Sequence, residues 1–148
     1  MDRKICKRRN KGALIMAEQT LIVLKPDSVR RHLIGEILRR FEQNSFTIKK
    51  LRMLTMSREE AEIFYSVHRE KPFFNELVSF ITSGPIVAAV IEGQDAVNRV
   101  RQIIGATKPN EAAEGTVRKD FGTSITQNAI HASDSHESFI KESKVIFG

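Results

Sequence analysis

Thr20-Leu21-Ile22-Val23-Leu24 is a short apolar run rich in β-branched residues, and Lys25-Pro26-Asp27 ends it. A run of this length with turn residues after it predicts a buried strand that ends in a turn. We expect this strand to lie in the centre of a sheet. A second apolar run, Ile86-Val87-Ala88-Ala89-Val90-Ile91, follows the sharp turn Ser83-Gly84-Pro85 and is the clearest buried strand in the chain.

Helical patterns separate the predicted strands. Apolar residues recur at helical spacing from Leu33 to Phe41, with charged residues on the opposite side, which predicts an amphipathic helix. Ser57 and Glu60 form a capping-box signature for a helix that runs through Tyr65. The other expected elements are a strand over residues 46–56, helices over about 72–81 and 95–104, and a last strand that leads to His131. Four strands interleaved with helices predict an α+β sandwich built on a split βαβ motif.

The composition favours one domain with a basic N-terminal leader. The chain has 148 residues, of which 41% are hydrophobic, enough for one core but short for two domains. Residues 1–15 hold six of the 24 Lys and Arg residues and one of the 18 acidic residues, so most of the net charge of +6 lies there. We therefore divide the chain into a disordered leader, residues 1–15, and a nearly neutral domain, residues 16–148. A nearly neutral domain argues against specific nucleic-acid binding.

The leader does not have the pattern of a signal peptide. Its basic residues are followed by an apolar stretch, Ala13-Leu14-Ile15-Met16-Ala17, that is short for an h-region and stops at Glu18. No run approaches the roughly 20 apolar residues of a membrane span. The only cysteine, Cys6, lies in the leader, so no disulfide and no thiolate metal cluster is expected inside the domain. These features predict a cytoplasmic protein without a membrane partner.

The stretch Asn128-Ala129-Ile130-His131-Ala132-Ser133-Asp134-Ser135 places one histidine before a cluster of helix-capping residues. Asp134 or Ser135 can cap a helix, and Asp134 with Glu137 would form a variant of the capping box. The N-terminal N–H groups of such a helix favour a nearby anion such as phosphate. Because a neutral imidazole is nucleophilic near neutral pH, His131 is a candidate nucleophile for phosphoryl transfer.

The second ring nitrogen of His131 needs a partner that fixes its tautomer. Glu142, about two turns into the expected helix, is the candidate, and Ser133 could steady the Glu142 carboxylate. From local sequence alone, the simpler interpretation is that His131 is a packing or capping histidine.

Phosphate binding would have to depend on side chains, because neither GxxxxGK[ST] nor GxGxxG occurs in the chain. Lys25, at the end of a buried strand, is the first candidate, since a lysine is rarely needed for packing there. Further candidates, each also readable as a solvated surface residue, are Arg101, Thr107 and Arg118. No aspartate pair has the spacing of metal ligands, so we expect no protein metal site and a Mg²⁺ carried by the nucleotide phosphates. Phe73 or Phe74 could stack on a base, and stacking alone tolerates every base.

Taken together, these segments resemble the nucleoside diphosphate kinase family, in its short, bacterial-type form, over nearly all of residues 20–147. The matching motifs occur in family order, and the ordered set is highly specific. They are Leu24-Lys25-Pro26-Asp27-Ser28, Ile34-Gly35-Glu36-Ile37, Phe64-Tyr65, Lys71-Pro72-Phe73-Phe74, Ser83-Gly84-Pro85, Gly105-Ala106-Thr107, Gly115-Thr116-Val117-Arg118 and residues 128–135. Three departures, Ser28, Lys119 and Ala132, remove no reacting group.

The resemblance implies a ferredoxin-like sandwich with a four-stranded antiparallel sheet, and assembly into homotetramers or homohexamers. It also implies a ping-pong transfer of the γ-phosphate from a nucleoside triphosphate to a nucleoside diphosphate through a phosphohistidine at His131, with broad base specificity. Glu142 matches the orienting carboxylate and Ser133 its support, and Lys25 is included among the catalytic residues. The family's nucleotide-binding positions match Lys25, Tyr65, Phe73, Leu77, Arg101, Thr107, Arg118 and Asn128.

One alternative belongs to a different functional class, a non-catalytic nucleotide- or RNA-binding module that uses the ferredoxin-like sheet and the basic leader. The second expected strand offers no pair of exposed aromatic residues of the RNA-binding type, and the neutral domain predicts a shallow salt dependence. We therefore favour the enzyme.

Overall fold

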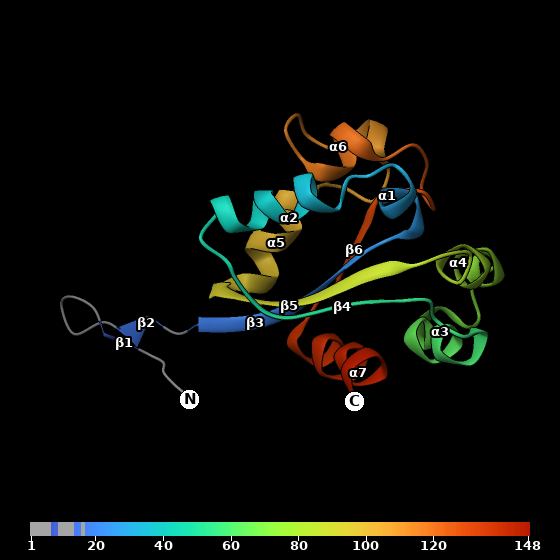
Figure 1. The fold of residues 1–148 in the computed structure, drawn as a ribbon, viewed down its shortest axis with the longest axis horizontal. Coiled ribbons are helices and arrows are strands. Elements are labelled where there is room, and N and C mark those ends of the chain that lie inside the picture. Colours follow the sequence, from blue (N-terminus) through green and yellow to red (C-terminus); the bar gives the residue numbers. More distant parts are fainter. Residues whose placement is uncertain (1–6, 9–13, 16) are drawn as a thin grey trace.

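The computed structural model describes residues 7–8, 14–15 and 17–148 (Figure 1). Two short strands, β1 (Lys7–Arg8) and β2 (Leu14–Ile15), pair with each other. Most of the predicted leader, including Cys6, lies outside the described residues. Among the helices that are described, none is both long enough and apolar enough to cross a bilayer.

The main sheet has four antiparallel strands in the order β4-β5-β3-β6. These strands are β3 (Ala17–Leu24), β4 (Thr47–Leu54), β5 (Ile86–Gln94) and β6 (Ile130–Ala132). If only these four strands are counted, from β3 as the first to β6 as the fourth, the order is 2-3-1-4, which is that of a split βαβ, ferredoxin-like sheet. The predicted fold class and the central position of the first strand are confirmed.

Helices cover both faces of this sheet (Figure 1). Side chains of a strand alternate between the two faces, so the apolar residues of β3 contribute to two hydrophobic cores, one on each face. Ile22 and Leu24 pack toward α2 (Ile34–Gln43) and α5 (Ala96–Ile104). On the other face, Leu21 and Val23 pack toward three helices. These are α3 (Arg58–Phe64), α4 (Phe74–Ile81) and α7 (His136–Phe147).

The capping box predicted for α3 is present, whereas the capping box predicted for α7 is not. Ser57 and Glu60 form the predicted capping box of α3. At α7, Ser135 is the N-cap, and its hydroxyl accepts from the backbone N–H of Ser138 at 3.1 Å. The predicted Asp134–Glu137 box is therefore wrong. Asp134 instead accepts from the Ser138 hydroxyl at 2.7 Å, because it lies one residue before the cap.

Two short helices lie at the end of the sheet where β3 finishes. The sequence predicted only a turn after Lys25, whereas the structure has α1 (Pro26–Arg30). Proline suits the first position of a helix, but five residues are too few for a visible hydrophobic period. Between Gly105 and Gly122 the chain is locally ordered. It forms a 3₁₀ turn (Pro109–Glu111) and α6 (Val117–Phe121), which Thr116 caps.

Gly105 and Gly115 provide a matched test of this local order. Both have positive φ, 90° and 85°, but a Cβ at Gly105 would lie 2.5 Å from Thr116 Oγ1, whereas one at Gly115 would meet nothing within 4 Å. We expect Gly115→Ala to lower the free energy of unfolding by about 1 kcal/mol through backbone strain. Gly105→Ala should cost about 1–3 kcal/mol more, because it also displaces the cap of α6. Urea unfolding measures both, and equal losses would contradict the clash.

Candidate active site

A cavity of about 340 Å³ opens at the end of the sheet formed by β3 and β6. Residues from α4, α5, α6, β6, α7 and the intervening loops line it, so segments far apart in the sequence meet there. All but one of the residues singled out from the sequence line this cavity. They are Lys25, Tyr65, Phe73, Leu77, Arg101, Thr107, Arg118, Asn128, His131 and Glu142. The exception, Ser133, is buried beside it and contacts Glu142.

His131 lies on β6 opposite Val23, so its side chain projects from the sheet face that α3 and α7 cover. Phe64 and Tyr65 pack against the ring at centroid distances of 4.9 and 6.1 Å. Aromatic packing on one side and a strand on the other restrict the ring to few orientations.

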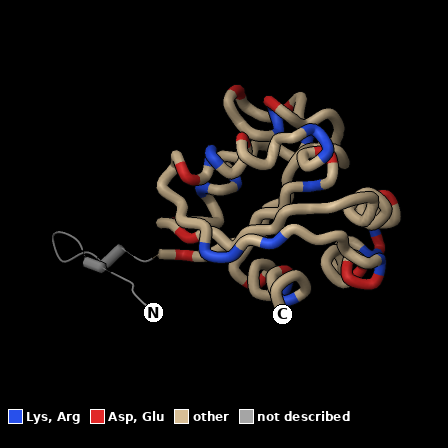
Figure 2. The backbone as a smooth tube through the Cα atoms, in the orientation of Figure 1, with Lys and Arg blue, Asp and Glu red and all other residues tan. Residues whose placement is uncertain are grey.

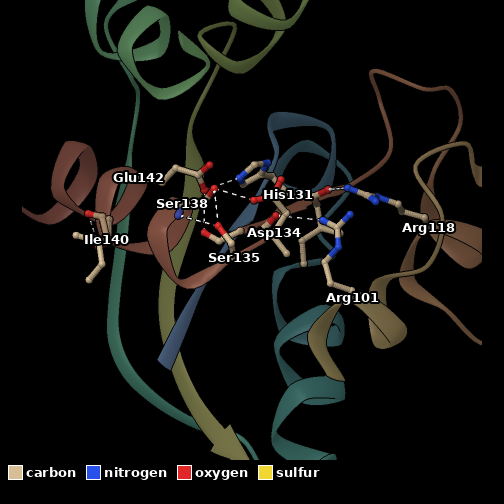
Figure 3. Close-up of polar contacts among 12 residues, drawn as sticks. Arg101, Arg118, His131, Asp134, Ser135, Ser138, Ile140 and Glu142 are labelled. Carbon is tan, nitrogen blue, oxygen red and sulfur yellow. Dashed lines mark hydrogen bonds and ion pairs between the residues drawn. The ribbon is translucent and has the colours of Figure 1, made fainter. Parts of the chain in front are cut away.

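A carboxylate fixes which ring nitrogen of His131 faces the cavity (Figure 3). Glu142 Oε1 lies 2.8 Å from His131 Nε2 and also accepts from the Ser133 hydroxyl at 2.8 Å. A proton on Nε2 satisfies this contact, which leaves the lone pair on Nδ1. Among the described residues, no hydrogen bond involves Nδ1, so this nitrogen can act as a nucleophile.

The backbone before His131 is strained and held by α1. Ala129 is fully buried with φ of 78°, a region that non-glycine residues rarely adopt. The N–H of Ile130 donates to the carbonyl of Asn128 at 3.0 Å, which closes a tight turn around Ala129. Asp27 accepts from the Ala129 N–H at 3.1 Å, and the Ser28 hydroxyl donates to the Ala129 carbonyl at 2.7 Å. Thus the helix that the sequence missed fixes the entry to β6.

Lys25 extends from the end of β3 into the cavity wall and is only 4% exposed. Its Nζ donates to Asn128 Oδ1 at 2.9 Å and to the Thr126 carbonyl at 3.4 Å. Burial, together with the positive charge of Arg118, lowers the pKa of Lys25 to about 7. The Asn128 amide donates in turn to the carbonyls of Thr107 and Ile125, both at 3.0 Å. An anion in the cavity would favour the charged form of Lys25.

Two arginines bind the outer edge of β6 (Figure 3). Arg118 donates to the Ile130 carbonyl at 2.7 Å and to the Gly105 carbonyl at 3.1 Å, and Arg101 donates to the Ala132 carbonyl at 3.4 Å. Burial and the charge of Arg101 lower the pKa of Arg118 to about 10. The Nε of Arg118 is buried without a partner among the described residues. The two guanidinium groups therefore flank His131 with donor capacity to spare.

The mouth of the cavity is apolar. Phe73, Val67 and Ile125 line it and are 42%, 68% and 52% exposed. Phe74 is 8% exposed and belongs to the core, so Phe73 is the one of the two phenylalanines that lines the cavity. An exposed apolar cluster beside a charged pocket is suited to a flat, aromatic ligand group.

Several residues of the lining were not predicted from the sequence. An apolar side chain in the polar stretch 123–128 was a usable signal for Ile125. His68 follows Tyr65 by one helical turn, and its ring centroid lies 5.6 Å from that of Phe73. Burial and the nearby His131 lower the pKa of His68. The others are Val67, Thr126, Ala132, Asp134 and Ser138.

The described residues contain no group of three or more His, Cys, Asp or Glu side chains placed to hold a metal ion. The two carboxylates of the cavity have partners, since Glu142 contacts His131 and Asp134 accepts from Ser138. The three cations of the cavity suit phosphate groups, which themselves supply oxygen ligands for Mg²⁺.

Known proteins share this fold and length. The family model described as nucleoside diphosphate kinase matches residues 18–148. Nucleoside diphosphate kinase of Staphylothermus marinus is 55% identical over 130 residues, which cover 88% of this chain and 92% of that protein. The solved nucleoside diphosphate kinase of Aquifex aeolicus matches with a TM-score of 0.87 at 52% identity, covering 89% of this chain and 96% of that one. That of Halobacterium salinarum, in complex with CDP, matches with a TM-score of 0.85 at 42% identity, covering 88% and 87%.

The contact between Asp27 and Ala129 can be tested by a conservative pair of variants. Asp27→Ala would leave the buried Ala129 N–H without an acceptor, so we expect the free energy of unfolding to fall by about 1–3 kcal/mol. Asp27→Asn keeps an acceptor oxygen and should cost less. Urea unfolding of both variants is the measurement, and an alanine variant as stable as the asparagine variant would contradict this role.

Proposed function

The chain belongs to the nucleoside diphosphate kinase family, enzymes of phosphate transfer between nucleotides, and on that premise we propose a ping-pong reaction through His131. In the first half-reaction, Nδ1 of His131 attacks the γ-phosphorus of a nucleoside triphosphate. The bond to the bridging oxygen breaks, and the nucleoside diphosphate leaves with the electron pair. In the second, a terminal phosphate oxygen of another nucleoside diphosphate takes the phosphoryl group from the phosphohistidine.

One observation carries this proposal, the contact of His131 Nε2 with Glu142 at 2.8 Å inside a cavity that three cations line. A carboxylate on one ring nitrogen makes the other more nucleophilic and stabilises the positive charge that the ring acquires on phosphorylation. Ser133 holds that carboxylate in place through its hydroxyl. Glu142 and Ser133 thus act by orienting His131.

The cations supply charge to the transferring phosphoryl group. Phosphoryl transfer passes through a loose transition state with charge spread over the phosphate oxygens, so fixed positive groups accelerate it. We assign this role to Lys25, Arg101 and Arg118, with Mg²⁺ carried by the nucleotide as a further source of positive charge. The remaining proposed contacts to sugar and phosphate come from Tyr65, Thr107 and Asn128.

We assign the apolar mouth to the base. Phe73 and Leu77 line the cavity and are suited to stacking, and stacking distinguishes little among bases. Broad base specificity follows from this arrangement. A non-catalytic nucleotide- or RNA-binding module is not favoured, since relatives about half identical to this chain are kinases. The cytoplasm, where nucleotides are made and consumed, is the compartment that suits this activity.

We further propose that residues 16–148 are the catalytic domain and assemble into a homotetramer or homohexamer. Strand β4 is an edge of the main sheet, and Leu51 and Met53 on it are 55% and 56% exposed. Exposed apolar side chains on an edge strand are suited to pairing with a second copy of the chain. Lys50 and Arg52 alternate with them, Lys49 precedes Lys50, and Figure 2 shows basic segments along β4.

Variants of His131 and Glu142 test the proposed roles. His131→Ala deletes the nucleophile, so transfer should fall to background and no label from γ-labelled ATP should remain on the protein. Glu142→Gln should slow transfer by about 10²–10³-fold while acid-labile label still accumulates on His131. Rapid-quench assays with a panel of diphosphates measure both. Equal loss in the two variants would contradict the orienting role of Glu142.

The lowered pKa of Lys25 predicts proton uptake on nucleotide binding. At about pH 8 Lys25 is mostly neutral, and phosphate beside it raises its pKa, so binding should take up about one proton. Uptake should vanish below about pH 6, where Lys25 is already charged. Calorimetry in buffers of different ionisation enthalpy measures it. Lys25→Arg, which stays charged, is the control, and unchanged uptake in that variant would exclude Lys25 as the proton acceptor.

Lysine substitutions on β4 test whether the chain assembles through this strand. Leu51→Lys with Met53→Lys places five like charges along one edge, so we expect the assembly to dissociate into smaller species, each a whole multiple of the 16.8 kDa chain. Ile63→Lys is the matched control, because Ile63 is equally exposed, at 52%, but lies on α3. Light scattering measures the mass. A monomeric wild-type protein, or dissociation by the Ile63 variant alone, would contradict the proposed interface.

A further inference from the structure

The turn 123–127 forms one side of the cavity mouth and is closed by its own hydrogen bonds. The backbone N–H groups of Thr123 and Ser124 both donate to the Gln127 carbonyl, at 2.8 and 3.2 Å. The Gln127 N–H donates back to the Ser124 hydroxyl at 2.9 Å. These bonds make the turn a compact unit, which presents Ile125 to the cavity.

This turn is attached to the rest of the site on two sides. Toward the phosphate end, Lys25 Nζ donates to the Thr126 carbonyl at 3.4 Å, and the Asn128 amide donates to the Ile125 carbonyl at 3.0 Å. Toward the mouth, the Thr126 hydroxyl donates to Glu76 Oε2 at 3.0 Å, across 50 residues of sequence. Among the described residues, no other hydrogen bond joins the turn to α4.

Glu76 is placed to transmit this contact to the apolar wall. It lies in the first turn of α4, between Phe73 and Leu77, which are joined by a backbone hydrogen bond of 3.0 Å. Both neighbours line the cavity. Within the part of the chain that the structure describes, the bond from Thr126 to Glu76 is the only hydrogen bond that connects the Phe73 wall to the Ile125 wall.

We propose that Glu76 and Thr126 are a positioning pair that holds the two apolar walls at the spacing of a stacked base. This inference rests on the proposed function, since it assigns the mouth to the base of a nucleotide. The pair touches neither the phosphates nor the reacting nitrogen, so its loss should weaken nucleotide binding and leave the chemical step nearly unchanged. The pair would thereby set base affinity through the positions of Phe73 and Ile125.

The first test compares removal of either partner. Glu76→Ala and Thr126→Val should each weaken ADP binding by about fivefold, and the double variant should weaken it no further. Thr126→Ser keeps the hydroxyl and should restore binding, while kcat should stay within about twofold in all variants. Ser79→Ala, at an exposed position of the same helix, is the control. Calorimetry measures the binding, and thermal unfolding verifies that each variant folds.

The second test places the same variants in a Phe73→Ala background. There the wall has lost its stacking ring, so removal of Glu76 or Thr126 should change ADP affinity by less than about twofold. An undiminished effect in that background, or a weakening by Glu76→Ala that Thr126→Val does not reproduce, would overturn the proposal. The latter result would mean that Glu76 contacts the nucleotide directly.

The binding measurements do not depend on turnover. A wild-type protein that binds ADP but transfers no phosphate would refute the proposed function and leave the positioning pair standing. A protein that transfers phosphate normally but shows additive effects of the two substitutions would refute the positioning pair alone.

Discussion

The pairing of β6 with β3 is the interaction on which the candidate site depends. Only three residues of β6 pair, with Val23 opposite His131. Because side chains alternate between faces, a slip by one residue would turn His131 away from Glu142 and Tyr65 and into the other core. So short a strand cannot fix its own register. The strained turn at Ala129, with its hydrogen bonds to Asp27 and Ser28, fixes it from outside the sheet.

The same strand arranges the positive charges of the cavity. Successive carbonyls of a strand point to opposite sides, so those of Ile130 and Ala132 both lie on the free edge, where Arg118 and Arg101 reach them. Lys25 and Arg118 are buried, and each has a pKa lowered by burial and by a neighbouring cation. Such burial costs stability in the free protein. An anion would relieve that cost, so the free energy that an anion gains on binding comes partly from charges assembled in advance.

Most of the fold could be predicted from the sequence, because long helices and strands show a clear hydrophobic periodicity. The prediction failed at α1, whose five residues show no period. At α7 it left the cap open between Asp134 and Ser135, and the structure has Ser135 and not the Asp134–Glu137 box. His131 and Lys25 were visible from local pattern, whereas Tyr65, Leu77 and Asn128 became candidates only through the ordered motifs of the family. Contacts between residues far apart in the sequence could not be predicted from it. Nothing marks Ala129 as a residue with positive φ, and the 50 residues between Glu76 and Thr126 conceal their contact.

The two ends of the cavity differ in how firmly they are built, and this difference suits the proposed reaction. At the phosphate end, the buried Arg118 is anchored to the backbone of β6 and the buried Lys25 to Thr126 and Asn128. In-line transfer depends on positions accurate to a fraction of an ångström. At the mouth, the apolar side chains are about half exposed, and side-chain contacts join the walls. A purine and a pyrimidine differ in area but not in the position of their phosphates. A rigid phosphate site beside an adaptable stacking site can therefore accept every base without moving the phosphorus relative to His131.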